Sequence, residues 1–131
     1  MIKENDGVVV YTTNFARVKN LPAGVCPVSI CGKPPFPWNG LRYPKLMPKK
    51  GFFMEWKKNG DNDFYVRHFN DEVLSAVTQD GVVSELVELT KSRSIALCCL
   101  ENPADFCHRH LVSEWLREAG YVSHEFVGNT H

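Results

Sequence analysis

Short runs of β-branched, aromatic and other apolar residues recur along this chain, and each has the length of a single strand. Such runs occupy residues 8–11, 26–30, 94–100 and 121–127, and their composition is typical of β-strands. The run at 94–100 is almost continuously apolar, as expected of a strand that is covered on both faces. We therefore predict a sheet with residues 94–100 near its centre.

Between these runs the apolar residues recur at helical spacing. This periodicity predicts helices over residues 15–21, 63–77, 82–91 and 107–119. The second and third of these helices are expected to be separated near residues 80–81, where Asp-Gly favours a turn. Helices and strands thus alternate along most of the chain.

This alternation predicts a three-layer, Rossmann-like α/β domain. Its sheet should be mainly parallel, with about four to five strands and helices on both faces. The 131 residues fit a single domain, residues 1–131, which is large enough to bury a core without crosslinks. Repeated Pro and Gly over residues 32–51 predict one long irregular loop. Loops of this length in a small domain usually bind a ligand or cover a site.

Composition excludes several classes of protein. Lys plus Arg and Asp plus Glu each number 15, so the formal net charge is zero, and no broad field attracts nucleic acid or an anionic membrane. The longest apolar runs have strand length, and residues 1–6 lack the layout of a secretion signal. Five cysteines without such a signal favour reduced thiols over a disulfide framework. We expect a cytoplasmic protein without membrane association.

Candidate reactive residues cluster where the central strand passes through a polar loop into the last helix. Glu101, Cys107, His108 and Arg109 follow the strand at 94–100, and ligands of open parallel sheets bind beyond the carboxyl ends of the strands. A helix start offers free backbone N–H groups and the positive end of the macrodipole, so it attracts anions and lowers the pKa of a thiol. This segment therefore predicts phosphate or carboxylate chemistry.

Arg109 has two interpretations that spacing alone does not separate. A guanidinium in the first helical turn can hold a phosphate or carboxylate with two parallel hydrogen bonds. Alternatively, it forms an ion pair with Glu101 or Asp105. If the strands are parallel, the loop after the second strand brings Cys31 and Lys33 to the same edge of the sheet.

The neighbouring residues could carry a reaction or only build the structure. Cys107 could be a thiolate nucleophile, although buried cysteines are commonly packing residues. Glu101 could be a general base or bind a ribose hydroxyl, or else cap the helix or pair with Arg109. His108 and His110 point in different directions on a helix, which argues against both binding one metal ion.

The rival chemistry is a zinc site that combines Cys26, Cys31, Cys107 and His108. Its signal is weak, because close-spaced ligand pairs of the Cys-x-x-Cys kind are absent. Cys26 and Cys31 would also lie at opposite ends of one strand. We therefore predict neither a metal ion nor a cofactor.

The segment 42–58 interleaves lysines and arginine with aromatic residues. Such a segment could bind phosphates and stack bases, or its aromatic residues could anchor the loop to the core while the lysines are solvated. We favour the second interpretation. The first defines an alternative function, that of a non-catalytic module for binding nucleic acid or protein.

The order Cys99-Leu100-Glu101 followed by Cys107-His108-Arg109 resembles the Cys-x-Glu and Cys-His-Arg signature of the domain of unknown function 488 family. The likeness extends to segments 10–12, 29–33 and 52–56 and is to the short form found in bacteria and phages. It implies a small α/β fold with the signature at the carboxyl edge of the sheet. It implies no established reaction.

Our leading hypothesis is a protein that binds a phosphate-bearing small molecule, such as a nucleotide, at the start of the last helix. If the protein is an enzyme, we expect a transferase or hydrolase. The candidate catalytic residues are Glu101, Cys107 and His108, and the candidate residues for binding the anion or substrate are Arg109, Cys31, Lys33 and Cys99.

Overall fold

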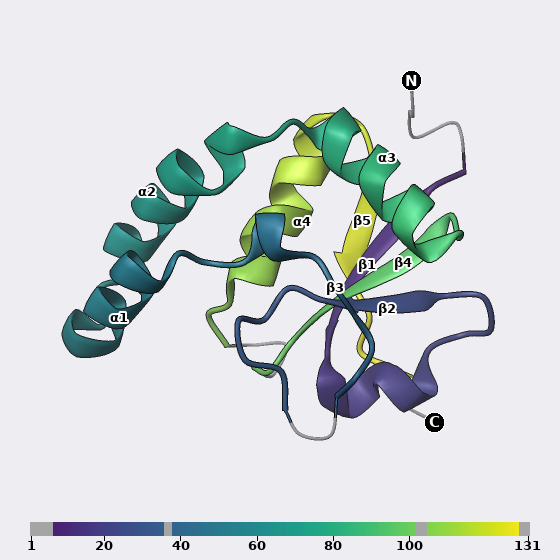
Figure 1. Ribbon diagram of the computed structural model, residues 1–131, viewed down its shortest axis with the longest axis horizontal. Helices are drawn as coiled ribbons and strands as arrows, with labels where there is room; N and C mark the ends of the chain where they lie inside the picture. The colour runs from purple at the N-terminus through teal and green to yellow at the C-terminus, as the bar shows by residue number, and fades with distance from the viewer. Residues whose placement is uncertain (1–6, 36–37, 102–104, 129–131) are drawn as a thin grey trace.

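The computed structural model describes residues 7–35, 38–101 and 105–128. The expectation about a secretion signal concerned residues 1–6, which lie outside the described residues, as do two positions of the predicted loop and residues 102–104 after Glu101. All strands of the sheet are parallel, in the order β3-β2-β4-β1-β5. The predicted α/β fold with a parallel sheet is confirmed (Figure 1).

The predicted position of the central strand is also confirmed. β4 (Ser94–Cys99) pairs with β1 (Val9–Asn14) on one side and with β2 (Cys26–Ser29) on the other. The outer strands are β3 (Leu41–Arg42) and β5 (Val122–Glu125). Because both faces of β4 are covered, five of its six residues are buried, which explains its nearly continuous apolar sequence.

Helical layers cover the two faces of the sheet. Figure 1 shows α3 (Gln79–Thr90) and α4 (His108–Glu118) on one side of the strands and the 3₁₀-helix η2 (Phe15–Asn20) on the other. The predicted helix at 15–21 is therefore a 3₁₀-helix, and this layer is thin. The helix predicted over residues 107–119 corresponds to α4.

The structure corrects the expectation of an irregular loop that reaches residue 51. The segment contains β3 and the 3₁₀-helix η3 (Pro44–Leu46), and a helix missed by the sequence analysis, α1 (Lys50–Asn59), begins at its end. Helix α1 ends at Gly60, whose φ of +64° suits glycine better than other residues. In Figure 1, α1 and α2 (Asn62–Glu72) form a pair that extends away from the sheet.

The break between the next two helices also differs from the prediction. It lies between α2 and α3 and contains the 3₁₀-helix η4 (Leu74–Ala76). Thr78 caps α3, because its side chain accepts a hydrogen bond from the Gly81 N–H. The Asp-Gly pair expected to break the helix therefore lies in the first turn of α3, where a polar residue is favourable.

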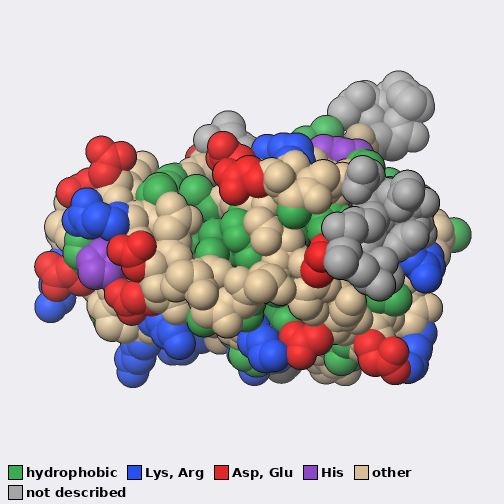
Figure 2. Space-filling model, turned by 90° about the horizontal axis from the view of Figure 1, so that it is seen from above, with side chains coloured by type: hydrophobic (Ala, Val, Ile, Leu, Met, Phe, Trp, Pro, Cys, Tyr) green, Lys and Arg blue, Asp and Glu red, His purple; other side chains and the backbone are tan. Residues whose placement is uncertain are grey.

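The surface has no extended region of one charge on the face seen in Figure 2. Acidic and basic side chains are interspersed there, with hydrophobic side chains exposed between them. This pattern agrees with the zero formal net charge. Within the described ranges, no helix combines the length and apolar character needed to cross a membrane.

Candidate functional site

A cavity of about 640 Å³ opens beyond the carboxyl ends of β2 and β4. Its volume is within the range of small-molecule sites in proteins. The start of α4 contributes to one side, and α1 and α2 supply an aromatic wall. Its polar and reactive lining residues are Cys31, Lys33, Lys50, Cys99, Glu101, Cys107 and His108.

The predicted site residues lie close together because β2 and β4 are parallel and adjacent in the sheet. Cys31 and Lys33 follow β2, Glu101 follows β4, and the two strands are neighbours in the sheet. The carboxyl ends of β2 and β4 therefore meet at one edge of the sheet, as was expected if the strands were parallel. Six of the seven predicted site residues line the cavity, and Arg109 is the exception.

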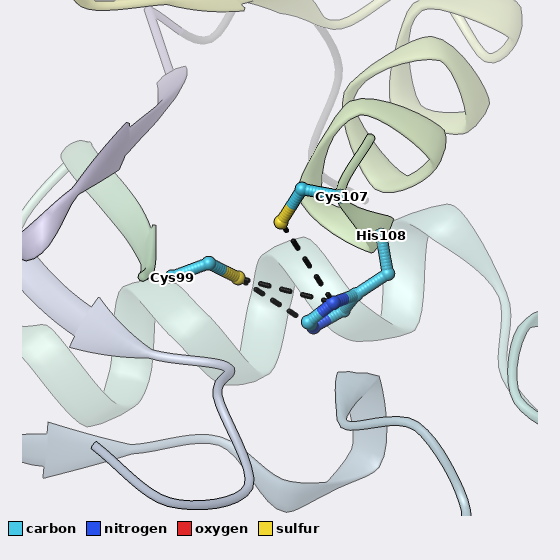
Figure 3. A group of neighbouring side chains, drawn as sticks. All are labelled: Cys99, Cys107 and His108. Carbon is cyan, nitrogen blue, oxygen red and sulfur yellow. Dashed lines mark hydrogen bonds between the residues drawn. The ribbon is translucent and has the colours of Figure 1, made fainter. Parts of the chain in front are cut away.

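Two thiols and one imidazole converge at the base of this site (Figure 3). Cys99 comes from the last position of β4, Cys107 caps α4, and His108 is the first residue of that helix. The Cys107 Sγ lies 4.0 Å from the His108 Nδ1, and the Cys99 Sγ lies 3.9 Å from Nδ1 and 3.6 Å from Nε2. All three residues are buried.

The backbone fixes the orientation of the His108 ring. Its Nε2 lies 2.7 Å from the carbonyl oxygen of Ile30. A carbonyl oxygen only accepts hydrogen bonds, so Nε2 carries the proton and donates it. In the neutral ring, Nδ1 then keeps its lone pair and lies beside the two sulfur atoms.

The surroundings of Cys107 favour its thiolate form. A hydrogen bond from the Cys99 thiol, assisted by His108 and by the backbone N–H of Arg109, holds the pKa of Cys107 well below its usual range, although burial opposes this. The Arg109 Nη1 also donates to the Cys107 Sγ at 3.5 Å. A thiolate is the reactive form of cysteine. Cys107 differs in this respect from the other four cysteines, whose pKa values are raised.

The pKa values of three other acidic groups in the cavity, those of Cys31, Cys99 and Glu101, shift in the opposite direction. Burial, followed by the hydrogen bond to Cys107, raises the pKa of Cys99 well above its ordinary value. Burial also raises the pKa of Cys31, and nearby Glu101 and Cys107 add to this effect. The pKa of the Glu101 carboxyl is raised by burial and by the negative charge of Cys107. The cavity therefore favours the charged form of Cys107 and disfavours the charged forms of Cys31, Cys99 and Glu101.

The structure places Arg109 behind Cys107 and away from the cavity. Its side chain is fully buried and forms a bidentate ion pair with Glu125, with Nε–Oε1 at 3.1 Å and Nη2–Oε2 at 2.9 Å. Glu125 also accepts a hydrogen bond of 2.6 Å from the Thr12 hydroxyl. The expected partners were an anion, Glu101 or Asp105, and the observed partner is instead on β5. Arg109 thus supports the sulfur and does not face a ligand in the cavity.

Aromatic side chains form the apolar wall of the cavity. Trp56 on α1, Tyr65 on α2 and Phe106 before α4 contact one another, with ring centroids 5.1 to 5.6 Å apart. Pro48, Phe53, Met54 and Leu100 also belong to the apolar lining. The contribution of α1 was not predicted from the sequence, although the aromatic spacing in 52–56 and the glycine at position 60 are signals of a short amphipathic helix.

The aromatic residues of segment 42–58 pack inward. Tyr43 and Phe52 are buried in the core, and Phe53 and Trp56 are partly buried against it. Lys45 forms an ion pair with Glu85 at 2.9 Å. This packing matches the interpretation in which aromatic residues anchor the segment, and it provides no exposed row of rings for stacking bases.

Among the described residues, the group able to hold a metal ion differs from the rival zinc site considered from the sequence. Ligand atoms of Cys99, Cys107 and His108 all lie within 4.8 Å of one another. Cys26 begins β2, at the end of the strand opposite the cavity, and does not belong to this group. His110 lies 3.8 Å from Glu125 and is also outside it, as its different direction on the helix predicted.

The model of the family DUF488-N3a, described as the active DUF488-N3 subclade, matches residues 17–120. This range covers most of the chain and includes every predicted site residue, from Cys31 to Arg109. Neither the search of the curated proteins nor the search of the solved structures gives a match.

Proposed function

The chain belongs to the DUF488 family, and from this premise and the geometry of its cavity we propose that the protein is a thiol-dependent transferase or hydrolase. Its substrate would be a small molecule with a planar ring and a phosphate group, such as a nucleotide. Cys107 would be the nucleophile. The observation that carries the proposal is the position of the Cys107 sulfur, which lines an aromatic cavity and accepts a hydrogen bond from Arg109.

The lining of the cavity supports this class of substrate. Trp56 and Phe106 offer partly buried ring faces and edges, on which a planar group can stack. Lys33 and Lys50 line the same cavity, and a lysine ammonium binds phosphate as a point charge. With Arg109 buried behind Cys107, these lysines and the positive end of α4 are the groups that would attract an anion.

The reaction would proceed through a covalent intermediate. The thiolate of Cys107 attacks the electrophilic atom of the substrate and forms a bond from sulfur to the transferred group. The bond to the leaving group breaks, and the leaving group takes the electron pair and the proton of the Glu101 carboxylic acid. Water or a second substrate then releases the group from sulfur and returns a proton to Glu101.

Alkylation by iodoacetamide tests whether Cys107 is the reactive thiol. A thiol with an ordinary pKa of about 8.5 is only about 0.3% thiolate at pH 6, so its alkylation rate rises roughly 75-fold between pH 6 and pH 8. Because the pKa of Cys107 is lowered, we expect its rate to change less than about threefold over this range. Mass spectrometry of the modified peptides measures each cysteine separately.

Cys26 is the internal control, because it is partly exposed and burial raises its pKa. It should be alkylated slowly at pH 6 and faster at pH 8. Equal pH dependence of Cys107 and Cys26 in the folded protein would contradict the proposed nucleophile.

A thermal-shift screen with nucleotides, sugar phosphates and inorganic phosphate tests the substrate class, since a selective ligand raises the apparent melting temperature. A stabilising nucleotide should lose its effect in Lys33→Ala and Lys50→Ala. It should keep its effect in Lys58→Ala, the matched control, which alters an exposed lysine of α1 outside the cavity. Stabilisation that survives both cavity substitutions, or no stabilisation by any phosphate compound, would contradict the proposed substrate class.

A further inference from the structure

The sulfur and nitrogen atoms at the base of the cavity have the spacing of ligands around one tetrahedral metal ion. Zinc binds thiolate sulfur at about 2.3 Å and imidazole nitrogen at about 2.0 Å, which places tetrahedral sulfur and nitrogen ligands about 3.6 Å apart. The His108 Nδ1 lies 3.9 Å from the Cys99 Sγ and 4.0 Å from the Cys107 Sγ. All three ligand atoms lie within 4.8 Å of one another, so small side-chain shifts bring them to the spacing of three ligands around one ion.

The hydrogen bond of His108 fits the same role. Histidine ligands usually donate their second ring N–H to a carbonyl or carboxylate, which fixes the tautomer and aims the free nitrogen at the metal. His108 donates from Nε2 to the Ile30 carbonyl at 2.7 Å. Its Nδ1 is thus the available ligand atom, and it faces Cys99 and Cys107 (Figure 3).

We propose that Cys99, Cys107 and His108 bind one soft divalent metal ion, such as Zn²⁺, with its fourth coordination position on the side of the cavity. All three residues line the cavity, so an incoming water or ligand can reach that position. Three protein ligands with one open position are the arrangement of catalytic and exchangeable zinc sites, whereas structural sites are closed by four.

Metal binding goes beyond the proposed function and opposes it. Coordination requires both sulfur atoms as thiolates, so the Cys99 proton is released to solvent as the ion binds. The Cys107 sulfur then shares its electron pair with the metal and is no longer free to attack a substrate. One cavity therefore has two exclusive states, a metal-free state with a reactive thiol and a metal-bound state that is protected from alkylation.

The experiment uses the reduced, chelator-treated full chain, titrated with Zn²⁺ and separately with Co²⁺. We expect one ion per chain, a thiolate-to-cobalt charge-transfer band in the near ultraviolet, and protection of Cys107 from iodoacetamide that a chelator reverses. Cys99→Ser and His108→Gln should each weaken binding by at least about 10-fold. In His108→Gln, the amide N–H can keep the bond to Ile30, while the amide oxygen is a poor ligand for zinc.

Cys98→Ala is the matched control. Cys98 is buried next to Cys99 on the same strand, and its side chain points to the opposite face of the sheet. It should bind zinc as the wild type does. Circular dichroism establishes that each variant is folded.

The absence of stoichiometric zinc binding in the wild type would overturn the proposal. So would unchanged affinity in folded Cys99→Ser or His108→Gln, because the ligands would then lie elsewhere. Alkylation of Cys107 in the metal-free protein is measured independently, so failure of the metal site and failure of the proposed nucleophile are distinguishable.

Discussion

The ion pair between Arg109 and Glu125 should be the costliest polar contact to break. The Arg109 side chain is fully buried and that of Glu125 is 18% exposed. Burial disfavours the charge of Arg109, but the hydrogen bonds from Arg109 to Glu125 and the negative charges of Cys107 and Glu125 outweigh this effect and raise the pKa of Arg109. The substitution Glu125→Gln keeps the shape of the side chain, removes its charge, and leaves the buried guanidinium without a carboxylate.

The expected cost follows from the burial of the remaining charge. Removing one partner of a buried ion pair costs about 3 to 5 kcal/mol, because the other charge stays buried and unpaired. Glutamine retains one accepting oxygen, so we expect a loss near the lower limit, about 3 kcal/mol of unfolding free energy. For a domain of this size, that loss corresponds to a fall in melting temperature of about 10 °C.

Urea denaturation followed by circular dichroism measures this free energy, and alkylation of Cys107 measures the effect on the site. Because Glu125→Gln removes a negative charge and leaves the unpaired guanidinium beside the Cys107 sulfur, the alkylation midpoint of the variant should move to lower pH. Glu118→Gln alters an exposed residue of α4 and should leave both measurements unchanged. A loss below about 1 kcal/mol in Glu125→Gln, the range of exposed ion pairs, would refute the reasoning.

Three further predictions concern the reaction, the pH dependence and the fold. Once a substrate is identified, Glu101→Gln should abolish turnover and leave the dissociation constant nearly unchanged, and full turnover would remove Glu101 from the mechanism. The lowered pKa of Cys107 stabilises the fold in full above the unfolded pKa of about 8.5, and this contribution is lost as the pH falls toward the folded pKa. The difference in melting temperature between the wild type and Cys107→Ser should therefore widen from pH 6 to pH 8, and a constant difference would argue against the lowered pKa. Gly60→Ala should cost about 1 kcal/mol in urea denaturation because the φ of +64° strains alanine, whereas a neutral result would show that the end of α1 relaxes freely.

The central part of the fold could be predicted because its signals are local. The apolar run of β4, the amphipathic face of α4 and the polar segment between them occur in unbroken order along the chain. These signals alone predict that Glu101 and Cys107 lie at one edge of the sheet, whatever the order of the other strands. The approach of Cys31 required only the further assumption of parallel strands, which the structure satisfies.

The contacts of Arg109 could not be predicted in this way. Its partner Glu125 lies on β5, and no helical spacing connects the two positions. Glu101 and Asp105 are closer in sequence and were therefore considered first. An acidic residue in the largely apolar segment 121–127 was the available signal, because a carboxylate beside a core requires a buried partner.

Helix α1 was missed for a different reason. Pro48 and Gly51 suggested that the irregular loop continued. Proline and glycine are stronger local signals against a helix than the aromatic residues that follow are in favour of one. Packing decides the outcome, because Phe52 is buried and contacts Tyr65 of α2. A short helix gains most of its stability from such tertiary contacts and little from its own sequence.

The strand order also determines when the site can form during synthesis. β1 is the first strand in the chain, yet both of its hydrogen-bonded neighbours, β4 and β5, come last, after β2 and β3. Closing these distant pairs is slow, because the chain entropy is lost before the contacts are gained. Cys107 follows β4, and the carboxylate that holds Arg109 against it arrives with β5. The buried contact between the Arg109 guanidinium and the Cys107 sulfur therefore forms only after β5 has been synthesised.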